Sequence, residues 1–261
     1  METLFLPSKI ELKKTKTPNQ AILTIEPLYH GYGTTLGNAL RRVLLSSLPG
    51  AAVTSFKIKG VQHEFSAIKG IYEDALQIML NLKQLRLKMF SDEPVVLKLN
   101  KKKEGEVLAK DIAKDANVEI INQDFKIATI TDKNTEFNME ITVEKGRGFL
   151  PTENQDKEKL PVGTIAVDAI FSPIRDVGIK VENTRVGQIT NYDKITLTLE
   201  TDGTITPDEA INYAAKILID HFSLLHKEEK KPLLAEEKKP REKKKTVEVK
   251  TTKKTVKKAK K

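Results

Sequence analysis

Residues 31–50 read GYGTTLGNALRRVLLSSLPG and carry the clearest folding signal in this chain. Apolar residues recur along this stretch at the spacing of one helical face and end before the Pro-Gly pair. The members of this apolar stripe are Leu36, Ala39, Leu40, Val43 and Leu44. The stretch therefore predicts an amphipathic helix, with Thr34 or Thr35 as its N-cap.

The opposite side of this predicted helix carries Asn38, Arg41, Arg42 and Leu45. One interpretation is a solvated face with an incidental leucine, because single exposed leucines are common. The other is a docking face for a protein, since interfaces favour arginine beside an apolar anchor. The helix by itself favours the solvated face.

Outward from this helix, alternating apolar residues predict several strands. The segment AILTIE at residues 21–26 predicts a strand closed by Pro27. Further strands are predicted at residues 53–61, 95–99, 139–143, 165–169, 177–181 and 195–199. One helix is predicted over residues 71–85, so strands and helices do not alternate regularly. The pattern is typical of an α+β fold rather than of βαβ repeats.

A second strong helix is predicted from Thr206 to about His226. The run Thr-Pro-Asp-Glu at residues 206–209 supplies an N-cap, a proline at the first helical position and a capping box. One apolar set, suited to covering a sheet, comprises Ile211, Ala214, Ala215, Leu218, Phe222 and Leu225. Ile217 and Leu224 form a second stripe that needs another helix of this chain or a second copy, and self-association is the favoured alternative.

The net charge of +9 is unevenly distributed. Residues 227–261 contain 15 Lys and 1 Arg against 6 Glu, a net charge of +10, so the preceding 226 residues carry −1. This Lys-, Glu- and Pro-rich tail has too few apolar residues to fold, and we expect it to be disordered. It is either a solubilising extension or a non-specific contact for DNA, because lysines bind phosphates without reading bases.

Several function classes are excluded or disfavoured. The chain has no cysteine and four histidines, which excludes disulfides, zinc–thiolate sites and a cysteine nucleophile. No signal peptide or membrane span is present, so a cytoplasmic location and no membrane contact are expected. The glycines at 31 and 33 lack the third glycine of a dinucleotide fingerprint.

The acid pairs of the chain favour helix capping over catalysis. Glu73 and Asp74, like Asp208 and Glu209, each lie in the first turn of a predicted helix, where the helix dipole favours acids. Adjacent helical residues also point about 100° apart, which suits paired acid–base chemistry poorly. We therefore predict no catalytic residue, no metal site and no cofactor on this chain.

The order of motifs along residues 1–226 resembles the alpha subunit of bacterial RNA polymerase. Beyond residues 31–50, the motifs that carry this resemblance are EPL at 26–28, GVQHEFS at 60–66, NLK at 81–83, LNK at 99–101, GRGF at 146–149, VDA at 167–169, FSP at 171–173 and TDGTI at 201–205. The resemblance implies an α+β, two-domain architecture. A dimerisation domain of residues 1–50 plus 172–226 would be interrupted by an inserted β-rich domain of residues 51–171. The tail, residues 227–261, stands where the family normally adds a helical DNA-binding domain.

The resemblance also implies site residues. The homodimer contacts carried over are Phe5, Tyr32, Leu36 and Val43, with Leu218, Phe222 and Leu225 assigned to the same interface on the last helix. Arg42 and Leu45 correspond to contacts with the beta subunit, which moves the interpretation of that helix face from solvated to docking. Lys83 and Val167 correspond to contacts with beta-prime.

The function implied is a homodimeric scaffold on which the beta and beta-prime catalytic subunits of DNA-directed RNA polymerase assemble for transcription. The chain would be a non-catalytic subunit of a nucleotidyltransferase, and the magnesium-dependent chemistry would belong to its partners. The alternative, favoured by the Lys-rich end alone, is a basic-tailed nucleic-acid-binding or ribosome-associated protein.

Overall fold

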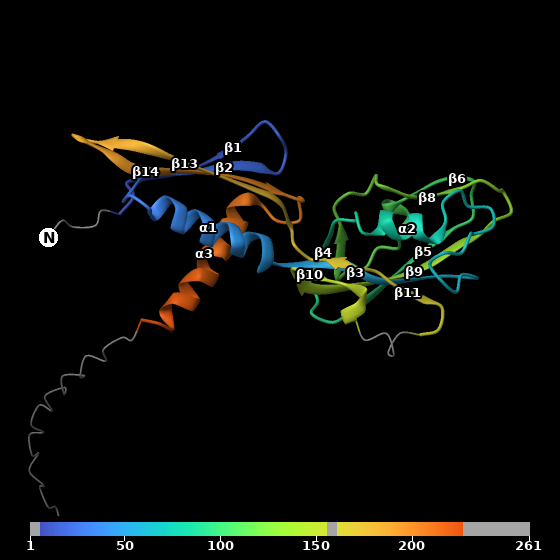
Figure 1. Ribbon diagram of the computed structural model, residues 1–261. Coiled ribbons are helices and arrows are strands. Elements are labelled where there is room, and N and C mark those ends of the chain that lie inside the picture. Colours follow the sequence, from blue (N-terminus) through green and yellow to red (C-terminus); the bar gives the residue numbers. More distant parts are fainter. Residues whose placement is uncertain (1–5, 156–160, 227–261) are drawn as a thin grey trace, which may run out of the picture. The chain divides into compact units, whose positions relative to one another are not determined.

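The computed structural model describes residues 6–155 and 161–226 (Figure 1). Within these residues the helices are α1 (Tyr32–Ser46), α2 (Ala75–Leu82) and α3 (Pro207–Ser223), with short 3-10 turns η1 (Ala109–Asp111) and η2 (Thr152–Asn154). The strands are β1 (Lys9–Lys14), β2 (Gln20–Leu28), β3 (Pro49–Ile58), β4 (Leu87–Met89), β5 (Val95–Lys101), β6 (Gly105–Leu108), β7 (Val118–Ile120), β8 (Lys126–Ile130), β9 (Phe137–Arg147), β10 (Phe149–Leu150), β11 (Thr164–Ala166), β12 (Ala169–Ile170), β13 (Ile174–Val186) and β14 (Ile189–Thr201). The fold is α+β, as the sequence predicts.

A four-stranded antiparallel sheet joins the two ends of the folded chain. Its strand order is β1-β2-β14-β13, so β2 near the N-terminus pairs with β14 near the C-terminus. Helices α1 and α3 lie on one side of this sheet and contact each other (Figure 1). The buried residues between the sheet and these helices, here called the four-strand core, are Leu23, Ile25, Leu28, Leu44, Leu48, Ile174, Val177, Ile195, Leu197, Leu199, Ala210 and Ala214.

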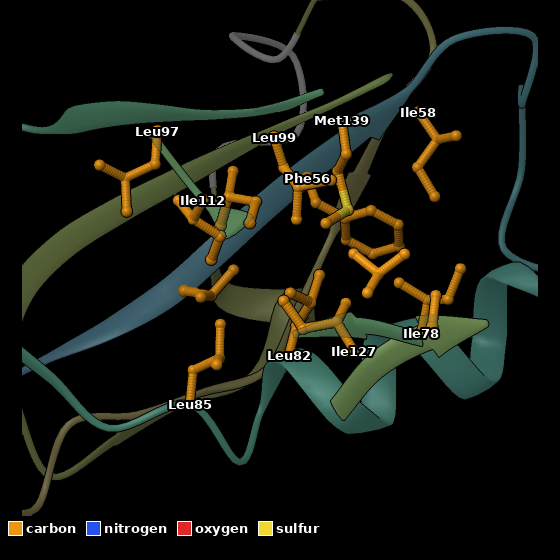
Figure 2. Packing of buried hydrophobic residues seen from close by; sticks show 14 of the residues in the cluster. Phe56, Ile58, Ile78, Leu82, Leu85, Leu97, Leu99, Ile112, Ile127 and Met139 are labelled. Atoms are coloured by element: carbon orange, nitrogen blue, oxygen red, sulfur yellow. The ribbon is translucent and has the colours of Figure 1, made fainter. Parts of the chain in front are cut away.

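A larger antiparallel sheet fills the middle of the chain. Its strand order is β5-β9-β3-β4-β7, with β11 paired to β3, and helix α2 packs on it together with the two-stranded β6–β8 sheet. In Figure 2, Ile78 and Leu82 of α2 point toward Phe56 and Met139 of the sheet. The buried residues of this region, which run from Val53 to Val167, are here called the six-strand core.

The chain passes from one core to the other and back. Leu48 belongs to the four-strand core and Val53 to the six-strand core, and the return falls between Val167 and Ile174. The middle segment is therefore a β-rich insert between two parts of the first core. The division into residues 1–50 plus 172–226 and 51–171 stays a prediction.

The start of α1 differs from the prediction. The helix begins at Tyr32, and the N-cap position is Gly31, with φ of 83° and no side-chain capping bond. Thr34 and Thr35 lie inside the first turn, so the prediction that one of them is the N-cap is wrong. The face of α1 buried against the sheet carries Gly33, Gly37 and Leu44. The two glycines let the helix backbone lie close to β13 and β14, and because they have no side chain the apolar pattern of the sequence does not mark this face.

The middle helix is shorter than predicted. Ile71 forms an isolated bridge with Ile130, and α2 begins only after Asp74, whose carboxylate caps it by accepting from the Gln77 N–H at 2.7 Å. Glu73 does not cap the helix. Its carboxylate is buried and accepts from the Thr129 N–H and hydroxyl, which ties the start of α2 to β8.

Helix α3 starts as predicted, and Ile211 and Ala214 of its predicted sheet-covering set pack on the core, whereas Phe222 and Leu225 of that set are exposed. The capping box between Thr206 and Glu209 is present, with Pro207 at the first position. Ile217, expected in the unpartnered stripe, packs instead against the four-strand core. The helix ends at Ser223, three residues before the predicted end.

Candidate protein interaction surface

The predicted contact residues of α1 occupy two different flanks of the helix. At about 100° per residue, Tyr32, Leu36 and Val43 share one flank, and Arg42 and Leu45 lie on the other. Tyr32 is 46% exposed and Leu36 is 37% exposed, and Val43 is half-buried against the four-strand core. Helix α1 thus presents an apolar strip at its N-terminal half while its glycine face holds it on the sheet.

The last turns of α3 expose apolar side chains. Phe222 is 62% exposed and Leu225, just beyond the helix, is 79% exposed, whereas Leu218 is half-buried. Ile219 and Leu224 add to the same exposed end. This density of large apolar side chains on one helix end is typical of a surface that another protein covers. The tip of α3 is therefore the most apolar candidate interface of the helical layer.

Arg42 and Leu45 lie together on the exposed side of α1. Both are exposed, and no carboxylate pairs with the Arg42 guanidinium in the part of the chain that the structure describes. An arginine that has no ion pair of its own can give charge-assisted, bidentate hydrogen bonds to a partner, and the neighbouring leucine supplies apolar area.

Lys83 is already engaged within this chain. Its ammonium lies 3.1 Å from Oδ2 of Asp168, and the other carboxylate oxygen accepts from the Thr152 N–H at 2.9 Å. The Thr152 N–H and the Lys83 ammonium hold the pKa of the Asp168 carboxyl below its ordinary value. The surface offered at this position is a fixed ion pair rather than a free lysine.

Val167, which is expected to contact beta-prime, lies in the interior and not on the surface. Its side chain is fully buried in the six-strand core. Its backbone N–H donates to the Thr54 carbonyl at 2.8 Å, and its carbonyl accepts from the Gln155 amide at 2.7 Å. The side chain therefore has no surface to offer a partner, and its structural role is to anchor the segment that carries Asp168.

Two predicted features lie outside the described residues. These are Phe5, expected at the homodimer interface, and the Lys-rich segment of residues 227–261. In residues 6–155 and 161–226, no group of three or more histidine or acidic side chains is arranged to hold a metal ion. The helices in those same ranges fall short of the length and apolar content needed to cross a membrane.

One buried residue near these surfaces is not among the predicted site residues. Asp193 of β14 is 7% exposed, and its carboxylate accepts from the Gly33 N–H of α1 at 3.0 Å. The only sequence signal is an acid that precedes the alternating apolar positions 195, 197 and 199 of the same strand. That signal gives no hint of the partner, which lies 160 residues earlier.

The fold and these surfaces define an α+β protein with a β-rich insert and exposed, interaction-prone helices. Its insert matches a family model: the RNA polymerase Rpb3/RpoA insert domain covers residues 56–172.

Relatives extend the match over most of the chain. This chain is 59% identical over 200 residues to the DNA-directed RNA polymerase subunit alpha of Symbiobacterium thermophilum, and the match covers 77% of this chain and 63% of the relative. It is 54% identical to the protein of the same name from Moorella thermoacetica, covering 82% and 70%, and 51% identical to that from Alkaliphilus oremlandii, covering 83% and 68%. The chain therefore belongs to the family of DNA-directed RNA polymerase alpha subunits, and it spans 63 to 70% of the length of these relatives.

Proposed function

We propose that this chain is a homodimeric assembly scaffold of DNA-directed RNA polymerase, which binds the beta and beta-prime subunits for transcription in the cytoplasm. The observation that carries the proposal is the pair of contacting helices α1 and α3, whose exposed ends display tyrosine, leucine and phenylalanine. The names of the relatives support the assignment to this enzyme. The chain itself contributes no catalytic residue and no cofactor in this proposal.

The cost of leaving apolar surface exposed supports the proposed homodimer. Phe222 and Leu225 would each gain about 1.5–3 kcal/mol on full burial, and a twofold interface buries each of them twice. Tyr32, Leu36, Val43 and Leu218 complete the proposed interface, together with Phe5. A second copy is the favoured partner because an apolar patch on one copy can cover the same patch on another across a twofold axis.

Beta-subunit binding is assigned to Arg42 and Leu45. Replacing Arg42 by Ala removes the directional hydrogen bonds and should abolish recovery of beta with the tagged chain, while the dimer persists. Lys114→Ala removes an exposed charge from the insert and serves as the control. Normal recovery of beta by dimers of the Arg42→Ala chain would reject this assignment.

Beta-prime binding is assigned to the surface around Lys83. Because the Lys83 ammonium is paired with Asp168, Lys83→Ala removes the cation from this surface and also leaves that carboxylate without its partner. We expect lower recovery of beta-prime and unchanged recovery of beta. Equal loss of both large subunits would point to a general folding defect instead.

The tail is proposed to contact DNA non-specifically. Deleting residues 227–261 removes a net charge of +10 and should weaken binding of the assembled polymerase to DNA without changing its sequence preference. The slope of log affinity against log salt should become shallower by about 0.9 for each DNA phosphate that the tail neutralises. An unchanged slope would leave the tail as a solubilising extension.

A further inference from the structure

A single acid interrupts an apolar row on the inner face of β14. The inward positions of this strand are Asp193, Ile195, Leu197, Leu199 and Thr201, and all five are buried. Burial of a carboxylate without compensating hydrogen bonds is costly, so an aspartate in such a row requires a specific partner. That partner is the Gly33 N–H of α1, at 3.0 Å from Oδ2.

Helix α1 needs this carboxylate because its own sequence provides no cap. The first N–H groups of a helix have no acceptor within the helix, and the N-terminal end carries partial positive charge. Gly31 occupies the N-cap position and has no side chain to accept from these groups. Asp193 supplies the missing acceptor and a negative charge from a strand 160 residues away.

Gly33 is the residue that lets the helix reach the carboxylate. A Cβ atom at this position would lie 2.8 Å from Cγ1 of Val181 and 2.9 Å from Oδ2 of Asp193. A side chain at position 33 would force Val181, Asp193 or the first turn of α1 to shift. The absence of a side chain at Gly33 therefore allows the contact between the start of α1 and Asp193.

Aromatic contacts also connect β14 to the Tyr32 side chain at the start of α1. Tyr192, next to Asp193, makes an edge-to-face contact with Tyr29 at 6.3 Å between ring centroids. Tyr29 makes a second edge-to-face contact with Tyr32 at 6.1 Å. The start of α1 is thus held both through its backbone and through the side chain that the proposed dimer uses.

We infer that Asp193 is a positioning residue for the homodimer interface: by capping α1 from β14, it fixes the helix start that presents Tyr32 and Leu36 to the second copy. This inference rests on the proposed homodimer. Asp193 is itself buried, so its influence on assembly would pass through the placement of α1.

The test compares two buried acids in the full chain. Asp193→Leu removes the acceptor, and Asp193→Asn keeps a side-chain oxygen that can accept from Gly33. Glu73→Leu is the matched control, because Glu73 is a buried acid of the six-strand core that also accepts a backbone N–H. The readouts are hydrogen–deuterium exchange of residues 31–36 and the dimer dissociation constant from sedimentation.

We expect Asp193→Leu to raise exchange in residues 31–36 about tenfold and to weaken the dimer about tenfold, the scale of a lost helix cap. Asp193→Asn should stay closer to wild type in both readouts. Glu73→Leu should change neither. Wild-type values for Asp193→Leu, or equal damage by the Asn and Leu variants, would overturn the inference.

A further variant covers the case in which Asp193→Leu fails to fold. Gly33→Ala keeps the carboxylate but places a methyl group against the Asp193 and Val181 side chains, which disturbs the contact between Asp193 and the Gly33 N–H. It should therefore raise the same exchange and weaken the same dimer. Wild-type behaviour of Gly33→Ala would overturn the inference. A wild-type chain that stays monomeric would refute the homodimer, and the exchange of residues 31–36 alone would then decide whether Asp193 positions α1.

Discussion

The helices of the two cores differ in how much of their apolar surface is buried. Helix α2 is 8 residues long and buries Ala75, Ile78 and Leu82 against the large sheet and the two-stranded β6–β8 sheet. Helix α3 is 17 residues long, buries only Ala210 and Ala214, and exposes large apolar residues at its end. Helix α2 is covered within its own chain, whereas the end of α3 leaves large apolar side chains exposed, and this is the surface that we propose a second copy covers.

The largest effect is expected from placing charges at the exposed end of α3, which tests whether a second copy covers it. The double substitution Phe222→Glu and Leu225→Glu should weaken the dimer about 1000-fold or more, because four apolar side chains per dimer lose their burial. Sedimentation equilibrium measures the change. Phe90→Glu is the control, since Phe90 of the insert is also 62% exposed. A dimer that survives the double substitution would place the interface elsewhere.

The converse experiment creates a cavity in the six-strand core and asks whether the dimer is affected. Leu82→Ala removes a side chain that is 1% exposed and should lower the free energy of unfolding by about 3 kcal/mol, through lost burial and a cavity. Urea denaturation measures this loss. The dimer dissociation constant should not change, since α2 takes no part in the proposed interface. A weaker dimer at conditions where the variant is folded would contradict the separation of the two regions.

A smaller effect is expected at the start of α3. Thr206→Ala removes the hydroxyl that accepts from the Glu209 N–H and should cost about 1 kcal/mol of unfolding free energy. Thr198→Ala, which replaces a half-buried threonine of β14, controls for loss of a hydroxyl alone. Equal losses in the two variants would mean that the capping box does not stabilise the helix.

The smallest expected effect is dependent on pH. The pKa of Asp168 is lowered in the folded protein, so its ionised form stabilises the fold above the ordinary aspartate pKa of about 3.9. Asp168→Asn should therefore be less stable at pH 7 by under about 1 kcal/mol, since the carboxyl is partly exposed. The difference should shrink as the pH falls through the lowered pKa. A constant difference between pH 7 and pH 3 would exclude this origin.

Elements encoded by neighbouring residues were predictable from the sequence. The capping box of α3 is complete in residues 206–209, and the alternation in residues 195–199 identifies part of β14 directly. Strand β1 was missed because its residues KIELKK form an exposed edge with weak alternation. The apolar pattern places Phe222 and Leu225 on the sheet-covering face of α3, but both are exposed, whereas Ile217 of the other stripe packs on the core.

Features that depend on distant residues were not predictable from local patterns. The pairing of Leu23 with Leu197 brings together strands from the two ends of the folded chain, and no local spacing encodes it. The carboxylate that caps α1 belongs to Asp193, so the prediction of a threonine N-cap from neighbouring residues is wrong. The burial of Val167 likewise depends on β3, whose Thr54 carbonyl accepts its N–H.

The most direct test of the central claim is native mass spectrometry of the tagged chain recovered at low salt from its own cells. The scaffold account predicts an assembly with two copies of this 29.3 kDa chain and two much larger chains. Recovery of a single copy, or of the chain alone or with ribosomal proteins and nucleic acid, would contradict it.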